Sequence, residues 1–294
     1  MLFYSLYLLG LYGCLIIPKA VCYQIARWVA DLYCRRAVKD RQAVKGNLSA
    51  ILGTSEVSDA QVRELFRNFA MYLVDFFRFS RLDAAKVQRL VRVDGLERMR
   101  QALAGGRGVV GLTAHLGNYE LAGAVLSLAG LPVNAVVLSH RNRRVDDFFT
   151  RQRSHVEVKG IPIQRMGLKA FFQTCLSALE RNQILALVGD RDFFDHGLVL
   201  PFFGRTLRVP TGPANFSFRT GAPIVPAFLV REPDGGYRFI IESPIVPPQG
   251  LGREAAVRQM TESSLKVMET YIRRYPTQWY MFQEFWNPGP AVVL

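Results

Sequence analysis

The sequence lacks the spacing that cysteine chemistry requires. Its four cysteines are far apart and form no C-x-x-C pair; they are Cys14, Cys22, Cys34 and Cys175. A disulfide framework or a common zinc site needs closer and repeated spacing, so both are excluded. We expect buried free thiols in a reducing cytosol. We also expect a chemistry that uses no metal and no cofactor.

Other catalytic signatures are missing as well. No G-x-S-x-G run is present, so a serine nucleophile of the hydrolase type is not indicated. His140, His155 and His196 have no metal-ligand spacing and are expected to be structural or exposed. The run from Gly106 to Gly111 matches G-x-G-x-x-G, but it enters an apolar strand instead of following one. A dinucleotide-binding turn is therefore excluded.

Acidic residues are scarce relative to basic ones. There are 24 Asp and Glu against 37 Lys and Arg, which gives a formal net charge of +13. Such an excess suits an anionic partner, either a nucleic acid, an anionic membrane or an acidic protein. The common nucleic-acid modules have no signature here, so we expect no nucleic-acid partner, although the net charge alone keeps that alternative open. A membrane surface is favoured because the chain begins with an apolar segment.

No charged side chain occurs between Met1 and Pro18. The apolar run Leu2 to Ile17 is near the lower length limit for crossing a bilayer, and no signal-peptide cleavage site is evident. Three placements stay open, namely a short spanning helix, a helix in the membrane interface, and a helix packed on the domain. Tyrosines within the run favour the interface, and the basic residues that follow it favour the cytoplasmic side of the membrane. We therefore predict a membrane-associating helical region over residues 1–50.

Residues 51–294 are predicted to form one α/β domain with a largely parallel central sheet flanked by helices. A helix beginning near Ser58 or Asp59 carries a buried aromatic stripe that forms core or lines an acyl-chain groove. After residue 90, apolar runs alternate with amphipathic segments, the pattern of βαβ units. The expected strands are Val109–Ala114, Val133–Leu138, Ile184–Val188, Ile224–Val230 and Tyr237–Ile241, the last two pairing antiparallel. The expected helices are Leu96–Ala104, Tyr119–Ala129, Leu168–Glu180, Ala214–Thr220 and Arg253–Tyr275.

The candidate chemistry is carried by His115 and Glu120. His115 ends the first of these strands, and the carboxyl ends of strands are where open α/β sheets place their sites. On one continuous helix the two residues would lie about 140° apart, so they meet only if a turn at Gly117 separates them. An imidazole can then remove a proton from an alcohol, with the carboxylate on its other ring nitrogen. The sequence permits this dyad.

The run His115-Leu-Gly-Asn-Tyr-Glu120 resembles the H-x4-E signature of the bacterial lipid A late acyltransferases, within the lysophospholipid acyltransferase superfamily. The resemblance covers most of the chain. It includes Arg141-Asn142, the run 189–192 that contains Asp190, the blocks 201–204, 210–213 and 221–226, and the closing Trp-containing segments 278–280 and 285–286.

The resemblance implies an acyltransferase whose donor is an acyl thioester of acyl carrier protein or CoA. The acceptor would be a lipid hydroxyl at the inner membrane, on a lipid A precursor or a related glycolipid. His115 would be the general base and Glu120 its partner. The residues implied to hold substrate or order the site are Asn118, Arg141, Asn142, Arg153, Asp190 and Arg205, where Asn118 could serve only the turn and Arg153 and Arg205 could be solvated arginines.

The chain also departs from this family. Many lipid A enzymes carry an arginine-rich motif after the last tryptophan, whereas here the run from Met281 to Pro288 contains no arginine. Another lysolipid, aminolipid or glycolipid is therefore an alternative acceptor. A catalytically silent membrane scaffold is the alternative outside enzymology, and the His115/Glu120 pair speaks against it.

Overall fold

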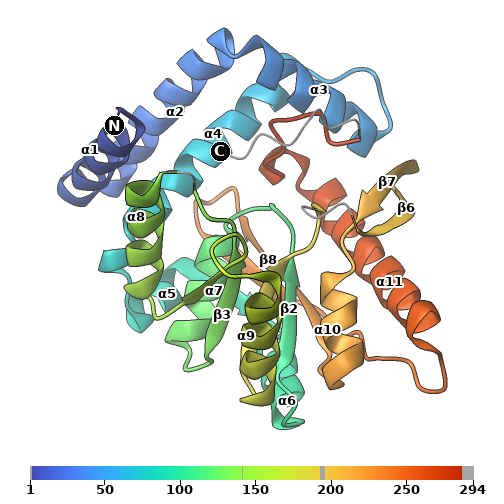
Figure 1. Cartoon of the computed structure of the whole chain (residues 1–294). Coiled ribbons are helices and arrows are strands. Elements are labelled where there is room, and N and C mark those ends of the chain that lie inside the picture. Colours follow the sequence, from blue (N-terminus) through green and yellow to red (C-terminus); the bar gives the residue numbers. More distant parts are fainter. Residues whose placement is uncertain (1, 141, 193–195, 287–294) are drawn as a thin grey trace.

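The computed structural model describes residues 2–140, 142–192 and 196–286, and these form an α/β domain with a helical N-terminal part (Figure 1). The N-terminal helices are α1 Leu2–Ile16, α2 Lys19–Arg36, α3 Val38–Leu52 and α4 Asp59–Phe77. The later helices are α5 Ala84–Leu90, α6 Leu96–Ala104, α7 Tyr119–Leu128, α8 Arg143–Ser154, α9 Leu168–Glu180, α10 Gly212–Thr220 and α11 Arg253–Arg274, with the 3-10 turns η1 Phe79–Arg81 and η2 Pro276–Gln278.

Within the described residues, the central sheet has seven strands in the order β1-β9-β8-β2-β5-β3-β4. All neighbours pair in parallel except β8 and β9, which are antiparallel as predicted. The bounds are β1 Val91–Asp94, β2 Val109–Thr113, β3 Val133–Val137, β4 Lys159–Pro162, β5 Ile184–Val188, β8 Ile224–Arg231 and β9 Tyr237–Ile241. A separate hairpin pairs β6 Leu198–Phe202 with β7 Arg205–Val209. The predicted fold class, strands and helices are confirmed, whereas β1, β4, β6, β7, α5 and α8 were not predicted.

The sheet is covered on both faces, which explains why its strands are apolar runs without strict alternation. Side chains from α5, α6 and α7 pack on one face together with parts of α4 and α8, and those from α9, α10 and α11 pack on the other.

All four cysteines are buried and unpaired, as expected. Helix α4 begins at Asp59, and its N-cap Ser58 forms a capping box with Gln61. Tyr72 and Phe76 of its aromatic stripe are buried.

The first helix packs on the domain with one face and leaves the other open. Tyr7 lies in an aromatic cluster with Phe77 of α4 and with Phe148 of α8. The exposed apolar side chains of α1 and α2, which we call the open apolar face, are Leu6, Leu9, Tyr12, Ile16, Val21, Ile25, Trp28, Val29 and Tyr33. Within the described part of the chain, no helix combines the length and apolar character needed to cross a bilayer. The domain boundary at residue 50 stays a prediction.

Candidate active site

Two neighbouring strands end side by side and bring His115 and Asp190 together. Thr113 at the end of β2 lies opposite Val188 at the end of β5, so the residues that follow each strand are also neighbours. The carboxyl ends of parallel strands meet at one edge of a sheet, where substrates bind in open α/β folds. The two functional side chains therefore come from segments 75 positions apart in the sequence.

The imidazole of His115 is held by the carboxylate of Asp190. Ring atom Nδ1 lies 2.7 Å from Oδ1 of Asp190. The other carboxylate oxygen, Oδ2, accepts hydrogen bonds of 2.9 Å from the backbone N–H of His115 and of 2.9 Å from the indole Nε1 of Trp279. The side chain of Asp190 is fully buried, while that of His115 is 22% exposed. One ring edge is thus anchored inside the protein and the other can face a substrate.

The hydrogen bonds of this pair determine the charge of Asp190 and the tautomer of His115. Burial disfavours the charge on Asp190, but the His115 ring, the Trp279 indole and the His115 N–H outweigh burial and hold the pKa of Asp190 below its ordinary value. An ionised carboxylate can only accept hydrogen bonds, so Nδ1 of the neutral imidazole carries the proton. Its Nε2 then has a free lone pair, which is the state that a general base requires.

The backbone around His115 is clamped between β8 and the segment that follows α11. Leu116 bridges to Trp279, and the carbonyl of His115 accepts a 2.8 Å bond from the N–H of Tyr280. Gly117 has φ +63°, and a Cβ there would lie 2.0 Å from a β8 carbonyl oxygen, so only glycine fits. Asn118 caps α7 by accepting from the N–H of Leu121 at 3.0 Å. The predicted turn between His115 and the helix is confirmed.

Glu120 is paired differently from the sequence prediction. It lies in the first turn of α7 as expected, but its carboxylate binds the guanidinium of Arg153 in α8, with Nε at 2.9 Å from Oε2 and Nη2 at 2.5 Å from Oε1. The carboxylate on the His115 ring is that of Asp190, so the expected contact between Glu120 and His115 is corrected. The reason is that the strand order puts Asp190 beside His115, whereas Arg153 of α8 is a buried cation that pairs with Glu120.

The Glu120–Arg153 pair is itself enclosed. Both side chains are 11% exposed. Burial opposes the positive charge of Arg153, but Glu120 outweighs it and raises the pKa of that guanidinium. Arg153 also lies near the rings of Phe76 and Phe149, at 6.0 and 5.8 Å from the ring centres. Arg153 is therefore not a solvated surface arginine, which was the alternative left open for it.

Of the remaining predicted residues, Asn142 and Arg205 do not join the His115 cluster. Arg141 lies outside the described residues. Asn142 is exposed and caps α8 through the N–H of Arg144 at 3.0 Å. Arg205 is on β7, with its guanidinium 5.4 Å from the ring centre of Trp286. Their predicted substrate contacts stay predictions. In residues 2–140, 142–192 and 196–286, no three His, Cys, Asp or Glu side chains come together to hold a metal ion.

Two roles were missed in the sequence. Asp190 was expected to order the site or hold substrate, without the ring contact, and Trp279 was noted only as part of a closing segment. The place of the aspartate at the carboxyl edge of the sheet could have been found, because it follows a buried strand, but its contact with the ring depends on the strand order, which the sequence does not show. The role of the Trp279 indole could not have been predicted, because this residue comes from the far end of the chain.

The ring of Tyr119 lies beside the imidazole, with its centre 5.5 Å from that of His115.

The chain is similar in sequence to bacterial acyltransferases. The sequence model of the family described as bacterial lipid A biosynthesis acyltransferase matches residues 1–287. A phosphatidylinositol mannoside acyltransferase of Mycolicibacterium smegmatis is 26% identical over 248 residues, covering 83% of this chain and 79% of that protein. A lipid A biosynthesis palmitoleoyltransferase of Escherichia coli is 25% identical over 241 residues, covering 81% and 75%. The structure of a 1-acyl-sn-glycerophosphate acyltransferase from Thermotoga maritima matches with TM-score 0.42 and 14% identity, covering 85% of this chain and 98% of that one.

Proposed function

The chain belongs to the family of bacterial lipid A biosynthesis acyltransferases, and we propose that it moves a fatty acyl chain from a thioester to a hydroxyl of a lipid, with His115 as general base. That the protein is an acyltransferase follows from the family. The observation that supports the proposed chemistry is the His115–Asp190 pair, a partly exposed imidazole whose tautomer is set by a fully buried carboxylate.

The reaction needs no protein nucleophile. Nε2 of His115 removes the proton of the acceptor hydroxyl as its oxygen attacks the thioester carbonyl carbon. The tetrahedral intermediate collapses by breaking the carbon–sulfur bond, and the imidazolium returns its proton to the leaving thiolate. Asp190 stabilises the imidazolium between these two steps and keeps the ring in position. The products are an ester of the lipid and a free thiol, so atoms and charges balance.

Glu120 supports this chemistry through Arg153 in our proposal. The buried pair ties the first turn of α7 to α8, and α7 starts four residues after His115. It thereby fixes the direction in which the chain leaves the catalytic turn. That Glu120 is needed for catalysis stays a prediction, whereas its expected direct contact with the imidazole is the part corrected above.

The substrates follow from the relatives. The two sequence relatives named above are, by their names, a phosphatidylinositol mannoside acyltransferase and a palmitoleoyltransferase of lipid A biosynthesis, so we propose a glycolipid acceptor. A lysophospholipid or an aminolipid is the second candidate, because the chain lacks the arginine-rich segment noted above. The donor is an acyl thioester of acyl carrier protein or CoA. The basic residues near Arg153 suit either the acidic carrier or the phosphates of CoA.

The proposed place of action is the cytoplasmic face of the inner membrane. The open apolar face of α1 and α2 carries Trp28, which is 67% exposed, and Leu9, which is 71% exposed. Large apolar side chains exposed together on a helix pair are typical of a surface that contacts a membrane or another protein. Arg35 and Arg36 end α2, where they can meet anionic headgroups. Peripheral attachment through this face suits an enzyme whose acceptor is a lipid.

The deciding experiment uses the full chain in detergent. Purified protein is incubated with labelled acyl carrier protein thioesters, and in parallel with acyl-CoA, plus a bacterial lipid extract, and products are read by mass spectrometry. We expect a new acylated lipid that is lost in His115→Ala. Activity that survives in His115→Ala would refute the general-base role. A complete lack of product with every donor and acceptor would favour the silent scaffold instead.

A further inference from the structure

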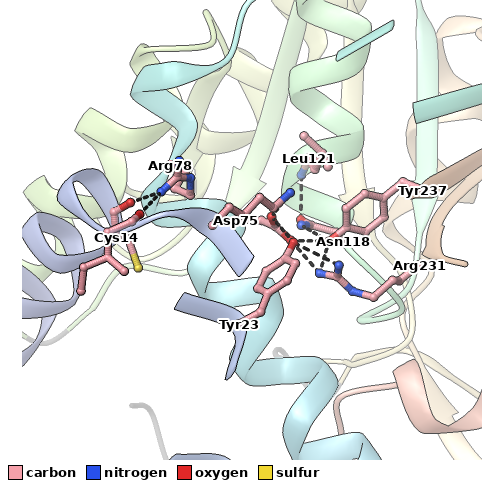
Figure 2. A network of polar contacts seen from close by, with 10 residues as sticks. Cys14, Tyr23, Asp75, Arg78, Asn118, Leu121, Arg231 and Tyr237 are labelled. Carbon is pink, nitrogen blue, oxygen red and sulfur yellow. Dashed lines mark hydrogen bonds and ion pairs between the residues drawn. The ribbon is translucent and has the colours of Figure 1, made fainter. Parts of the chain in front are cut away.

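A buried polar cluster joins the N-terminal helices to the sheet (Figure 2). Its centre is Asp75 of α4, which is only 5% exposed. From α2, Lys19 Nζ lies 2.9 Å from Oδ1 of this carboxylate, and the hydroxyl of Tyr23 donates to the same oxygen at 2.6 Å. From the sheet, Arg231 donates to Oδ2 at 2.7 Å, and the hydroxyl of Tyr237 donates to Oδ2 as well.

One route leads from this cluster to the start of α7. The hydroxyl of Tyr237 accepts a hydrogen bond of 3.4 Å from the side-chain amide of Asn118. Asn118 is the cap of α7, and its own backbone N–H donates to the carbonyl of Leu229 at 2.7 Å. His115 lies three residues earlier in the same turn. The orientation of the cap, and with it the turn, is therefore held by a side chain that Asp75 fixes.

A second route runs through the backbone of Arg231. Its N–H and carbonyl are both bonded by the side chain of Gln278, at 2.8 Å each. The carbonyl of Gln278 accepts from the N–H of Gly117 at 2.8 Å. The next residue, Trp279, donates to Asp190. Arg231 thus binds Asp75 through its guanidinium and Gln278 through its backbone. Gln278 in turn contacts the His115 turn at Gly117 and directly precedes Trp279, which binds Asp190.

The cluster is a charged one. Burial disfavours the carboxylate of Asp75, but Arg231 and Lys19 outweigh it, and the pKa of Asp75 lies below its ordinary value. Two cations and two hydroxyls share one carboxylate, so the arrangement has few alternatives once it is formed. Such a network specifies one geometry more strictly than apolar packing would.

We propose that Asp75 is a positioning residue through which the N-terminal helices hold the His115 turn in its working geometry. This inference rests on the proposed function and adds a regulatory element to it. Because α2 carries the open apolar face, seating of the N-terminal helices becomes a condition for full activity. Removing one contact of the cluster should lower the turnover number without changing how the donor binds.

A matched control exists in the same helix pair. Asp31 of α2 and Arg67 of α4 form a two-bond ion pair of 2.7 Å and 2.7 Å, and it has no bond to the catalytic turn among the described residues. The Asp31→Asn variant weakens the α2–α4 contact alone. The test variants are Asp75→Asn and the milder Tyr23→Phe and Tyr237→Phe, which each remove one hydroxyl and leave the carboxylate paired.

The experiment combines kinetics with amide hydrogen exchange of the full chain in detergent. Rates are measured at a temperature where circular dichroism shows each variant to be folded. We expect kcat to fall about tenfold or more in the cluster variants, the effect of a sub-ångström to 1 Å displacement of a catalytic group, with the KM for the donor unchanged. The losses of Tyr23→Phe and Tyr237→Phe should not add, because both hydroxyls lie on one route, in which Tyr23 acts through Asp75 and Tyr237 contacts Asn118. Peptides covering residues 114–121 should exchange faster in these variants and as in wild type in Asp31→Asn.

The outcomes separate the two proposals. Wild-type kcat and wild-type exchange at 114–121 in the cluster variants would overturn the positioning role while leaving the acyltransfer intact. Equal losses of kcat in Asp31→Asn and in the cluster variants would overturn it too, because helix packing alone would then explain them. If the wild type transfers no acyl chain, the proposed function fails, and the exchange data still decide whether Asp75 holds the turn.

Discussion

The Asp190→Asn substitution tests the structure most directly, because its effect can be worked out from three hydrogen bonds. In the wild type, Oδ2 of Asp190 accepts hydrogen bonds from two groups that can only donate, the backbone N–H of His115 and the indole N–H of Trp279. An asparagine must therefore turn its carbonyl oxygen toward these donors. Its amide N–H2 then faces the imidazole and donates to Nδ1.

This orientation reverses the tautomer of the base. With Nδ1 accepting, the proton of the neutral ring of His115 moves to Nε2, and the lone pair that takes the substrate proton is lost. The corresponding change in a Ser-His-Asp triad lowers kcat by about 10⁴-fold with the geometry intact. That loss equals about 5.4 kcal/mol of transition-state stabilisation. We expect a loss of this order for Asp190→Asn, with the fold retained because the side chain keeps its size.

The assay is the initial rate of lipid acylation at saturating donor, with circular dichroism to verify the fold. Asp94→Asn is the control, since Asp94 is a half-exposed carboxylate that pairs with Arg238 at the end of β1. Its kcat should equal that of the wild type. A kcat within tenfold of wild type for Asp190→Asn would refute the tautomer argument and return the carboxylate role to Glu120.

Three further predictions concern the surrounding charges and the open face. Glu120→Gln and Arg153→Met should each lower the free energy of unfolding by about 3–5 kcal/mol, because each leaves a buried charge unpaired, and the double variant should lose less than their sum in chemical denaturation. The pKa of Asp75 lies below its ordinary value of 3.8, so its contribution to stability is full above that value and disappears as the pH falls through the lower folded pKa. Acid denaturation of Asp75→Asn should therefore depend less steeply on pH below about 4, and an equally steep curve would contradict the charge assignment. Trp28→Ser should weaken co-sedimentation with anionic vesicles about tenfold or more, from the apolar area lost, whereas Val199→Ser on the exposed β6 hairpin should not.

Much of the fold could be predicted because its elements are marked locally. The apolar runs that became β2, β3, β5, β8 and β9 are short and bounded by polar or glycine-containing turns, and the helices between them have the 3.6-residue period. The segments that were missed lack such marks. The strand β4 has only four residues, and α8 is rich in arginine and has few apolar residues to indicate a buried face.

The candidate site was predicted in part for the same reason. Position 115 could be located because a histidine ends a buried strand and is followed by Gly117 and the cap Asn118, all within a few residues. The resemblance to the acyltransferases identified the chemistry. It also suggested Glu120 as the partner of the imidazole, since that residue is close in sequence.

The sequence by itself determined the parallel α/β architecture, the apolar N-terminus and the position of His115, the proposed general base, because hydrophobic period and turn residues act over short distances. Only the tertiary structure decided which carboxylate meets the ring. Asp190 reaches His115 because β5 lies beside β2 in the sheet, and Trp279 reaches Asp190 from the far end of the chain. Strand order and ion pairs of this kind are set by packing between distant segments, and no local pattern encodes them.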